Sequence, residues 1–170
     1  MKKYLILLAG LFLTTAAIAA DATTNGHMMD DGQMMAGKDH HGPALWGEPG
    51  DPKKVDRTVT IEATEIAYNV KDLTFRKGET VRFVFVNKGE QPHEFTIADD
   101  AEQLEHRKMM QDMAGMDMAN MGHNEANTVS AEPGETKELV WTFTHAGTFD
   151  FACNYPGHAE VGMEGKIVVK

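Results

Sequence analysis

The chain has 170 residues, of which 42% are hydrophobic and 25% are charged, and its formal net charge is −10. This length fits one domain of ordinary size with shorter flanking segments. The acidic balance argues against a nucleic acid as partner, because phosphate backbones are bound by surplus lysine and arginine.

The first residues have the pattern of a secretory signal peptide. Lys2 and Lys3 precede an apolar run, and Ala17-Ile18-Ala19 follows it as a small-x-small cleavage site. We therefore expect residues 1–19 to be removed on export to a bacterial periplasm. The alternative is a membrane anchor, but the run is short for the roughly 20 residues that a span needs. Cleavage would remove both lysines, take the charge from −10 to −12 and leave no membrane span.

Residues 20–54 form a polar, glycine-rich leader without periodicity, which predicts disorder. Thioethers suit Cu(I), and imidazole suits either copper oxidation state. The leader is therefore either a low-complexity tail or a flexible arm that collects copper. Residues 45–52 look like a more ordered lead-in, with Trp46 covering one end of the domain. The residues that would bind copper are His27, Met28, Met29, Met34, Met35, His40 and His41.

The remainder, residues 55–170, has the alternating hydrophobic pattern of short strands separated by Gly and Pro turns. In the clearest strand, 80–87, one face carries Val81, Phe83 and Phe85, and the other carries Arg82, Val84 and Val86. The predicted fold class is all-β, an antiparallel β-sandwich. The expected strands are 57–64, 73–75, 80–87, 93–98, 127–131, 136–144, 148–153 and 165–170.

An insertion of about residues 99–126 interrupts this domain and is rich in methionine. Its first four Met and His residues are spaced i, i+3, i+4, i+7, so they share one face of a short helix. Such a face usually packs against the domain. Here it could also bind additional Cu(I), because methionine is concentrated in this insertion and the leader. The residues concerned are His106, Met109, Met110, Met113, Met116, Met118, Met121 and His123.

The only cysteine, Cys153, is followed five residues later by His158 and five residues after that by Met163. A lone cysteine can be a small buried hydrophobe, but a stray thiol in an oxidising compartment needs protection, which a metal provides. Pro156-Gly157 would fold the segment back so that its ligands meet at one ion. A thiolate, an imidazole and a thioether need only a second histidine to complete a type 1 copper site.

His93 is the expected second histidine. It follows Pro92 and begins a predicted strand, so sheet pairing could hold it rigidly against the cysteine loop. His145 stands before Ala146-Gly147, and we interpret it as a turn residue.

With these motifs, Pro92-His93-Glu94-Phe95 and the Cys-x4-His-x4-Met segment, residues 55–170 resemble a cupredoxin. The spacing is similar to that of rusticyanins and auracyanins. The whole mature chain resembles the periplasmic copper-tolerance cupredoxins, which share a His/Met-rich leader and a Met-rich insertion. The resemblance implies a Greek-key β-sandwich and one type 1 copper held by His93, Cys153, His158 and Met163. Glu94 departs from the pattern, because azurins and plastocyanins commonly have Asn there to brace the cysteine loop.

Two functions follow as hypotheses. The first is copper tolerance, in which the protein binds and oxidises surplus copper or passes it to a copper-trafficking partner. The second is one-electron transfer between redox partners, with the edge of His158 as the electron route. Apart from oxidation of cuprous ions, no catalytic apparatus is evident, because neither His-x-His pairs nor a Ser-His-Asp set occurs.

Overall fold

The computed structural model describes residues 46–114 and 125–170. Contacts divide the chain into two units, 1–38 and 39–170, and every described residue belongs to the second. The predicted signal peptide and the His and Met residues of the leader lie outside the described residues. So do Met116, Met118, Met121 and His123 of the insertion.

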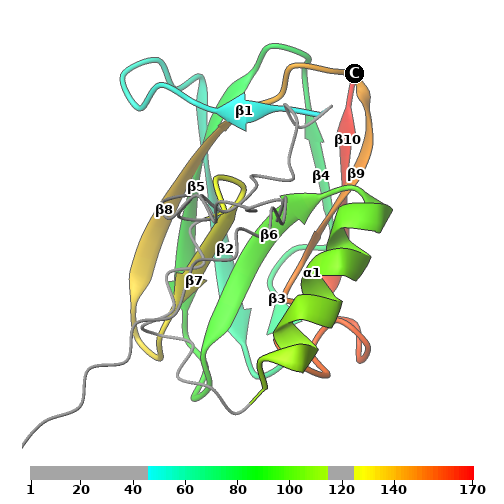
Figure 1. Cartoon of the computed structure of the whole chain (residues 1–170). Helices are drawn as coiled ribbons and strands as arrows, with labels where there is room; N and C mark the ends of the chain where they lie inside the picture. The colour runs from blue at the N-terminus through cyan, green and yellow to red at the C-terminus, as the bar shows by residue number, and fades with distance from the viewer. Residues whose placement is uncertain (1–45, 115–124) are drawn as a thin grey trace, which may run out of the picture. The chain divides into compact units, whose positions relative to one another are not determined.

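The described residues form two five-stranded sheets and one helix (Figure 1). One sheet has the order β1-β8-β5-β2-β3 and the other has the order β4-β10-β9-β6-β7. The strands are β1 (Glu48–Pro49), β2 (Arg57–Thr64), β3 (Ala67–Tyr68), β4 (Asp72–Phe75), β5 (Thr80–Asn87), β6 (His93–Ala98), β7 (Thr128–Ala131), β8 (Thr136–Thr142), β9 (Gly147–Ala152) and β10 (Glu164–Val169), and the helix is α1 (Asp100–Asp112).

The core lies between the two sheets. Val81, Phe83 and Phe85 of β5 are fully buried, as their alternation predicts. Across the core, the ring of Phe83 lies 5.1 Å from that of Phe95 on β6, measured between centroids. Two sheets that bury facing aromatic side chains in this way make a β-sandwich, so the predicted fold class is confirmed.

A wholly antiparallel arrangement, however, is wrong. β2 and β5 pair in parallel, with Arg57 opposite Val81, and β4 and β10 also pair in parallel, with Lys166 opposite Asp72. Alternation reports which face of a strand is buried but not the direction of its neighbour. That direction depends on the connections that carry the chain from one sheet to the other. The two-residue strands β1 and β3 were also not predicted.

The lead-in belongs to the folded unit. Trp46 is 1% exposed, and its ring centroid lies 4.7 Å from that of Trp141 on β8. β1 then pairs with β8, with Glu48 opposite Thr142. Gly47 is required at this approach, because a Cβ atom there would lie 2.1 Å from Nε1 of Trp141. β1 and the buried Trp46 thus precede residue 55, the predicted start of the domain.

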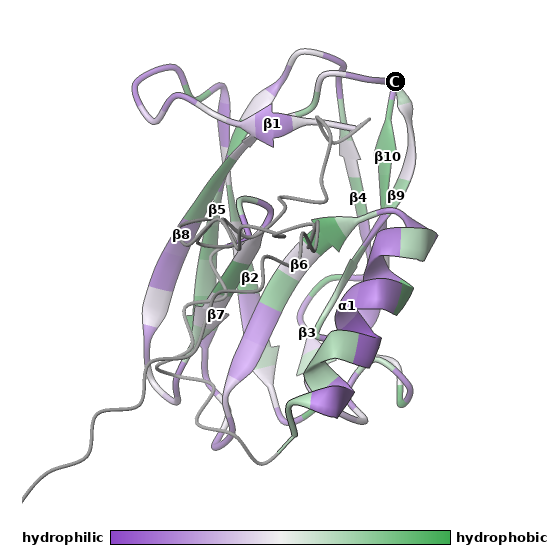
Figure 2. Cartoon of the chain, in the orientation of Figure 1, coloured by the Kyte–Doolittle hydropathy of each residue, from purple (hydrophilic) through white to green (hydrophobic). Residues whose placement is uncertain are grey.

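Asp99 directly precedes helix α1 and is its N-cap, because its carboxylate accepts hydrogen bonds from the backbone N–H groups of Ala101 and Glu102. Its buried residues recur at helical spacing and are Gln103, His106 and Met110. The rest of the helix is largely hydrophilic (Figure 2). α1 contacts β6 and β9, and all six residues of β6 are buried. The helix thus covers the part of that sheet's outer face that β6 and β9 form. Within the described ranges, no helix has the length and apolar character that crossing a membrane requires.

Candidate metal centre

Three strand ends meet at one end of the sandwich. His93 is the first residue of β6, Cys153 directly follows β9, and Met163 directly precedes β10. β9 pairs with both β6 and β10, so these three residues come from neighbouring strands. His158 lies in the loop that joins β9 to β10. The sheet therefore brings His93 to a cysteine 60 residues further along the chain.

Backbone hydrogen bonds close the loop between Cys153 and Met163. The N–H of Cys153 donates to the carbonyl of Met163 (3.0 Å), and the N–H of Met163 donates to that of His158 (2.9 Å). The predicted turn is present: the N–H of His158 donates to the carbonyl of Tyr155 (3.0 Å). Gly157 has φ 89°, a left-handed conformation that favours glycine.

The side chains of His93, Cys153 and His158 converge. Sγ of Cys153 lies 3.3 Å from Nδ1 of His158 and 3.9 Å from Nδ1 of His93. One donor atom from each of the three lies within 4.8 Å of the other two. His93, Cys153 and Met163 are fully buried, and His158 is 8% exposed. The three donors are thus preorganised around one point, with the Met163 backbone tied to the same loop.

Burial keeps these groups neutral in the metal-free protein. Desolvation, with the charge of Glu94 as a smaller contribution, raises the pKa of the Cys153 thiol to about 12. Desolvation lowers the pKa of both His93 and His158. Two neutral imidazoles and a thiol that can lose its proton to a metal are a soft donor set. These residues fit copper.

Glu94 braces the cysteine loop. Its Oε1 accepts a hydrogen bond from the backbone N–H of Asn154 (3.0 Å) and one from the hydroxyl of Thr96 (3.2 Å). The hydroxyl of Tyr68 donates to the backbone carbonyl of Glu94. The departure from asparagine at this position therefore keeps a side-chain contact to the residue after the cysteine, with a carboxylate in place of an amide.

Residues 55–170 match the family of copper-binding proteins described as the plastocyanin/azurin family. The chain belongs to this family of cupredoxins. Two relatives are each named copper-resistant cuproprotein CopI. The Rubrivivax gelatinosus protein is 40% identical over 100% of this chain and 97% of its own length. The Vibrio cholerae protein is 37% identical over 98% of each.

Solved auracyanin structures share the cupredoxin fold. Auracyanin A from Chloroflexus aurantiacus superposes with a TM-score of 0.53 at 28% identity, covering 66% of this chain and 99% of the other. Reduced auracyanin from Roseiflexus castenholzii gives 0.58 at 23% identity, covering 69% and 99%. This cupredoxin therefore binds copper, and the buried His93, Cys153 and His158 are consistent with one type 1 centre.

The secondary copper residues are placed differently. His106 and Met110 lie on the buried face of α1, whereas Met109 and Met113 are half-buried. In the described ranges, His93, Cys153 and His158 are the one cluster of three that the His, Cys, Asp and Glu side chains form at metal-binding distances. His145 is exposed at its turn and hydrogen-bonded to Thr144, as expected.

Two buried polar residues near the centre were not predicted. The side-chain amide of Asn154 donates to Oε1 of Gln103 on α1 (2.9 Å). Gln103 stands one helical turn before His106, so the periodicity used for the Met and His residues could have identified it. Asn154 could have been suspected from its position directly after Cys153.

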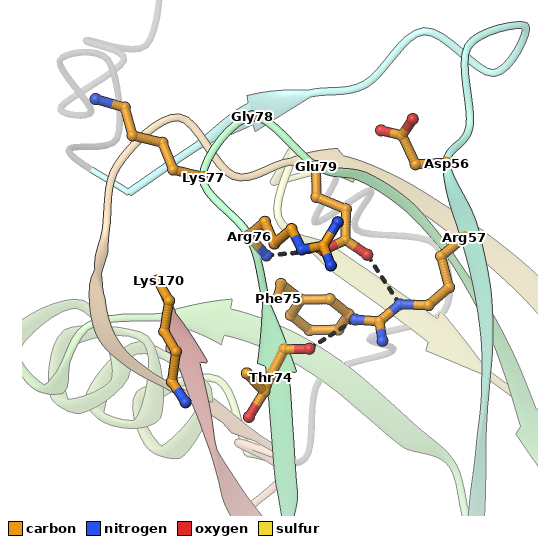
Figure 3. Close-up of a pocket in the computed structure, with 9 residues that line it drawn as sticks. All are labelled: Asp56, Arg57, Thr74, Phe75, Arg76, Lys77, Gly78, Glu79 and Lys170. Carbon is orange, nitrogen blue, oxygen red and sulfur yellow. Dashed lines mark hydrogen bonds and ion pairs between the residues drawn. The ribbon is translucent and has the colours of Figure 1, made fainter.

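A surface pocket lies at the opposite end of β10 from Met163 (Figure 3). The Arg57 guanidinium pairs with Glu79 (2.9 Å), donates to the carbonyl of Thr74 (2.7 Å) and lies over the ring of Phe75. These contacts fasten the start of β2 to β4 and to the turn before β5. The pocket is thus remote from the metal centre, and its Arg57 has a structural role.

Metal binding to the empty protein should release about one proton per ion at pH 7.5. Cys153 has a pKa of about 12 and is protonated there, while the lowered pKa values of His93 and His158 leave both imidazoles neutral. The measurement is titration with Zn²⁺, a redox-inert divalent ion, in weak buffer with an indicator dye. Release should fall towards zero in Cys153→Ser. Two protons per ion in the unmodified protein would contradict the assignment.

Proposed function

We propose that this chain is an exported copper-tolerance cupredoxin that binds and oxidises surplus copper in the bacterial periplasm. Its type 1 ligands are His93, Cys153, His158 and Met163. The convergence of His93, Cys153 and His158 at a buried end of the sandwich carries the proposal. The CopI relatives, named for copper resistance and matching nearly the full chain, support tolerance over general electron transfer.

The residues of this chain hold the copper ligands in a rigid arrangement. Bound copper supplies one-electron exchange between Cu(II) and Cu(I). The strand ends and the closed loop hold the donors fixed, so little rearrangement accompanies the change of oxidation state. A cuprous ion held by the Met and His residues of the leader or insertion would give one electron to the centre and become Cu(II). A redox partner would then accept that electron from the centre.

Anaerobic Cu(I) stoichiometry tests the proposal. The mature protein should hold more than one Cu(I) per chain in competition with a chromogenic chelator, because thioether and imidazole groups outside the centre also bind Cu(I). A variant lacking residues 20–42 should hold fewer. A single Cu(I) that is lost in Cys153→Ala would contradict a copper-collecting role.

Growth under copper tests the same function in cells. A copper-sensitive bacterium expressing the full chain should tolerate more copper than one expressing Cys153→Ala. Deletion of residues 20–42 should reduce tolerance while leaving the electron-transfer rate of the purified protein unchanged. Mass spectrometry of the periplasmic protein should find Ala20 at its N-terminus, and retention of residues 1–19 would count against export with cleavage.

The second candidate function is one-electron transfer between soluble redox partners. The observation that favours it is the surface beside His158: Val161 is 67% exposed, and the ring of Tyr155 lies 5.9 Å from the imidazole, between centroids. An apolar surface next to a ligand suits transient docking. Unchanged copper tolerance after loss of the gene, together with a lost respiratory activity, would favour this function.

A further inference from the structure

The buried carboxylate of Glu94, the residue after His93, is paired with a histidine of helix α1. Glu94 is 2% exposed on the outer face of β6. Its Oε1 lies 3.6 Å from Nε2 of His106 on α1 and also accepts the hydrogen bond from Asn154. Burying an ionised carboxylate without a cationic or hydrogen-bonding partner is costly. His106 is the cationic partner of Glu94 within the described residues.

The same helix also holds the side chain of Asn154. Oε1 of Gln103 accepts from the Asn154 amide (2.9 Å), and Nε2 of Gln103 donates to the carbonyl of Thr96 (3.0 Å). α1 therefore fixes the residue after Cys153 twice, through Gln103 directly and through His106 by way of Glu94. Hydrogen-bonding groups around the ligands of a metal orient those ligands and tune the metal.

We propose that His106 and Gln103 are positioning residues of the copper centre, which set its reduction potential and spectrum through Glu94 and Asn154. The inference rests on the ligand set proposed above. It gives α1, the helix that leads into the Met-rich segment, a role in tuning the metal rather than only in covering the sheet.

The charges of His106 and Glu94 should shift the reduction potential of the centre in opposite directions. Reduction adds one negative charge to the centre, so a nearby cation favours the reduced form and a nearby anion favours the oxidised form. The groups facing His106 are Glu94 from β6, Glu125 from the segment before β7 and Glu102 on its own helix. These carboxylates outweigh burial and raise the pKa of His106 above its ordinary value, so the imidazole is charged at pH 6.

The test is voltammetry and electron paramagnetic resonance of the copper-loaded full chain at pH 6. His106→Gln should lower the reduction potential, because it removes the cation and leaves the carboxylate. Glu94→Gln should raise it, because the amide oxygen can still accept from Asn154 but carries no charge. The matched control is His145→Gln, an exposed histidine at a turn, which should change neither the potential nor the spectrum.

Shifts of both variants in the same direction, or shifts no larger than that of His145→Gln, would overturn the proposal. If either variant fails to fold, Gln103→Met takes its place as the test of the positioning role. This substitution keeps the length of the side chain and removes the hydrogen bond to Asn154. It should alter the copper hyperfine splitting, and an unaltered spectrum would refute the positioning role. A wild-type protein without a thiolate–copper band would instead reject the ligand set.

Discussion

Replacing Cys153 with serine should abolish the intense visible absorption of the copper-loaded protein and weaken copper binding severely. The band arises from charge transfer between a thiolate and Cu(II), and Cys153 is the only cysteine in the chain. Its sulfur lies within 3.9 Å of the donor nitrogens of His93 and His158. Absorption spectroscopy and copper analysis after dialysis give the measurement. Persistence of the band in Cys153→Ser would exclude this centre.

A pair of histidine variants supplies the control. His158→Ala should also abolish the band, because it removes one of the converging donors and opens the site to water. His145→Ala changes the same residue type at an exposed turn and should leave both band and copper content unchanged. Equal loss in the two variants would point to general destabilisation and not to a ligand role.

Replacing Trp46 with alanine should lower the free energy of unfolding by about 3–5 kcal/mol. The side chain is 1% exposed, packs against Trp141 and Phe149, and donates from Nε1 to Glu102 on α1 (3.1 Å). Its removal opens a cavity and loses a contact between the lead-in and the helix. Urea denaturation of the copper-free protein, followed by circular dichroism, measures the change.

Two variants calibrate this loss. Trp46→Phe keeps much of the aromatic packing and should cost less than Trp46→Ala. Leu104→Ala removes a side chain that is 67% exposed on α1 and should change stability by no more than about 0.5 kcal/mol. A Trp46→Ala effect as small as that of Leu104→Ala would mean that the lead-in contributes nothing to the fold.

The sequence by itself determined the strand pattern and the local half of the metal site. Alternation along β5 predicts which side chains are buried, because successive residues of a strand point to opposite faces. Cys153 and His158 lie within one short loop, so spacing and turn chemistry suffice to group them. His93 was predicted from its place at the start of a strand, and the structure places it beside the cysteine.

Only the tertiary structure decided the partners that pairing and packing bring together. Strand direction depends on crossovers between sheets, which alternation does not encode, and the burial of Trp46 depends on Trp141, far along the chain. The Met and His stripe of α1 was compatible with either packing or copper binding. The helix docks on the outer face of β6, so His106 faces Glu94. The sequence left open whether His106 packs against the domain or binds copper, and the tertiary structure places it in the packed interface.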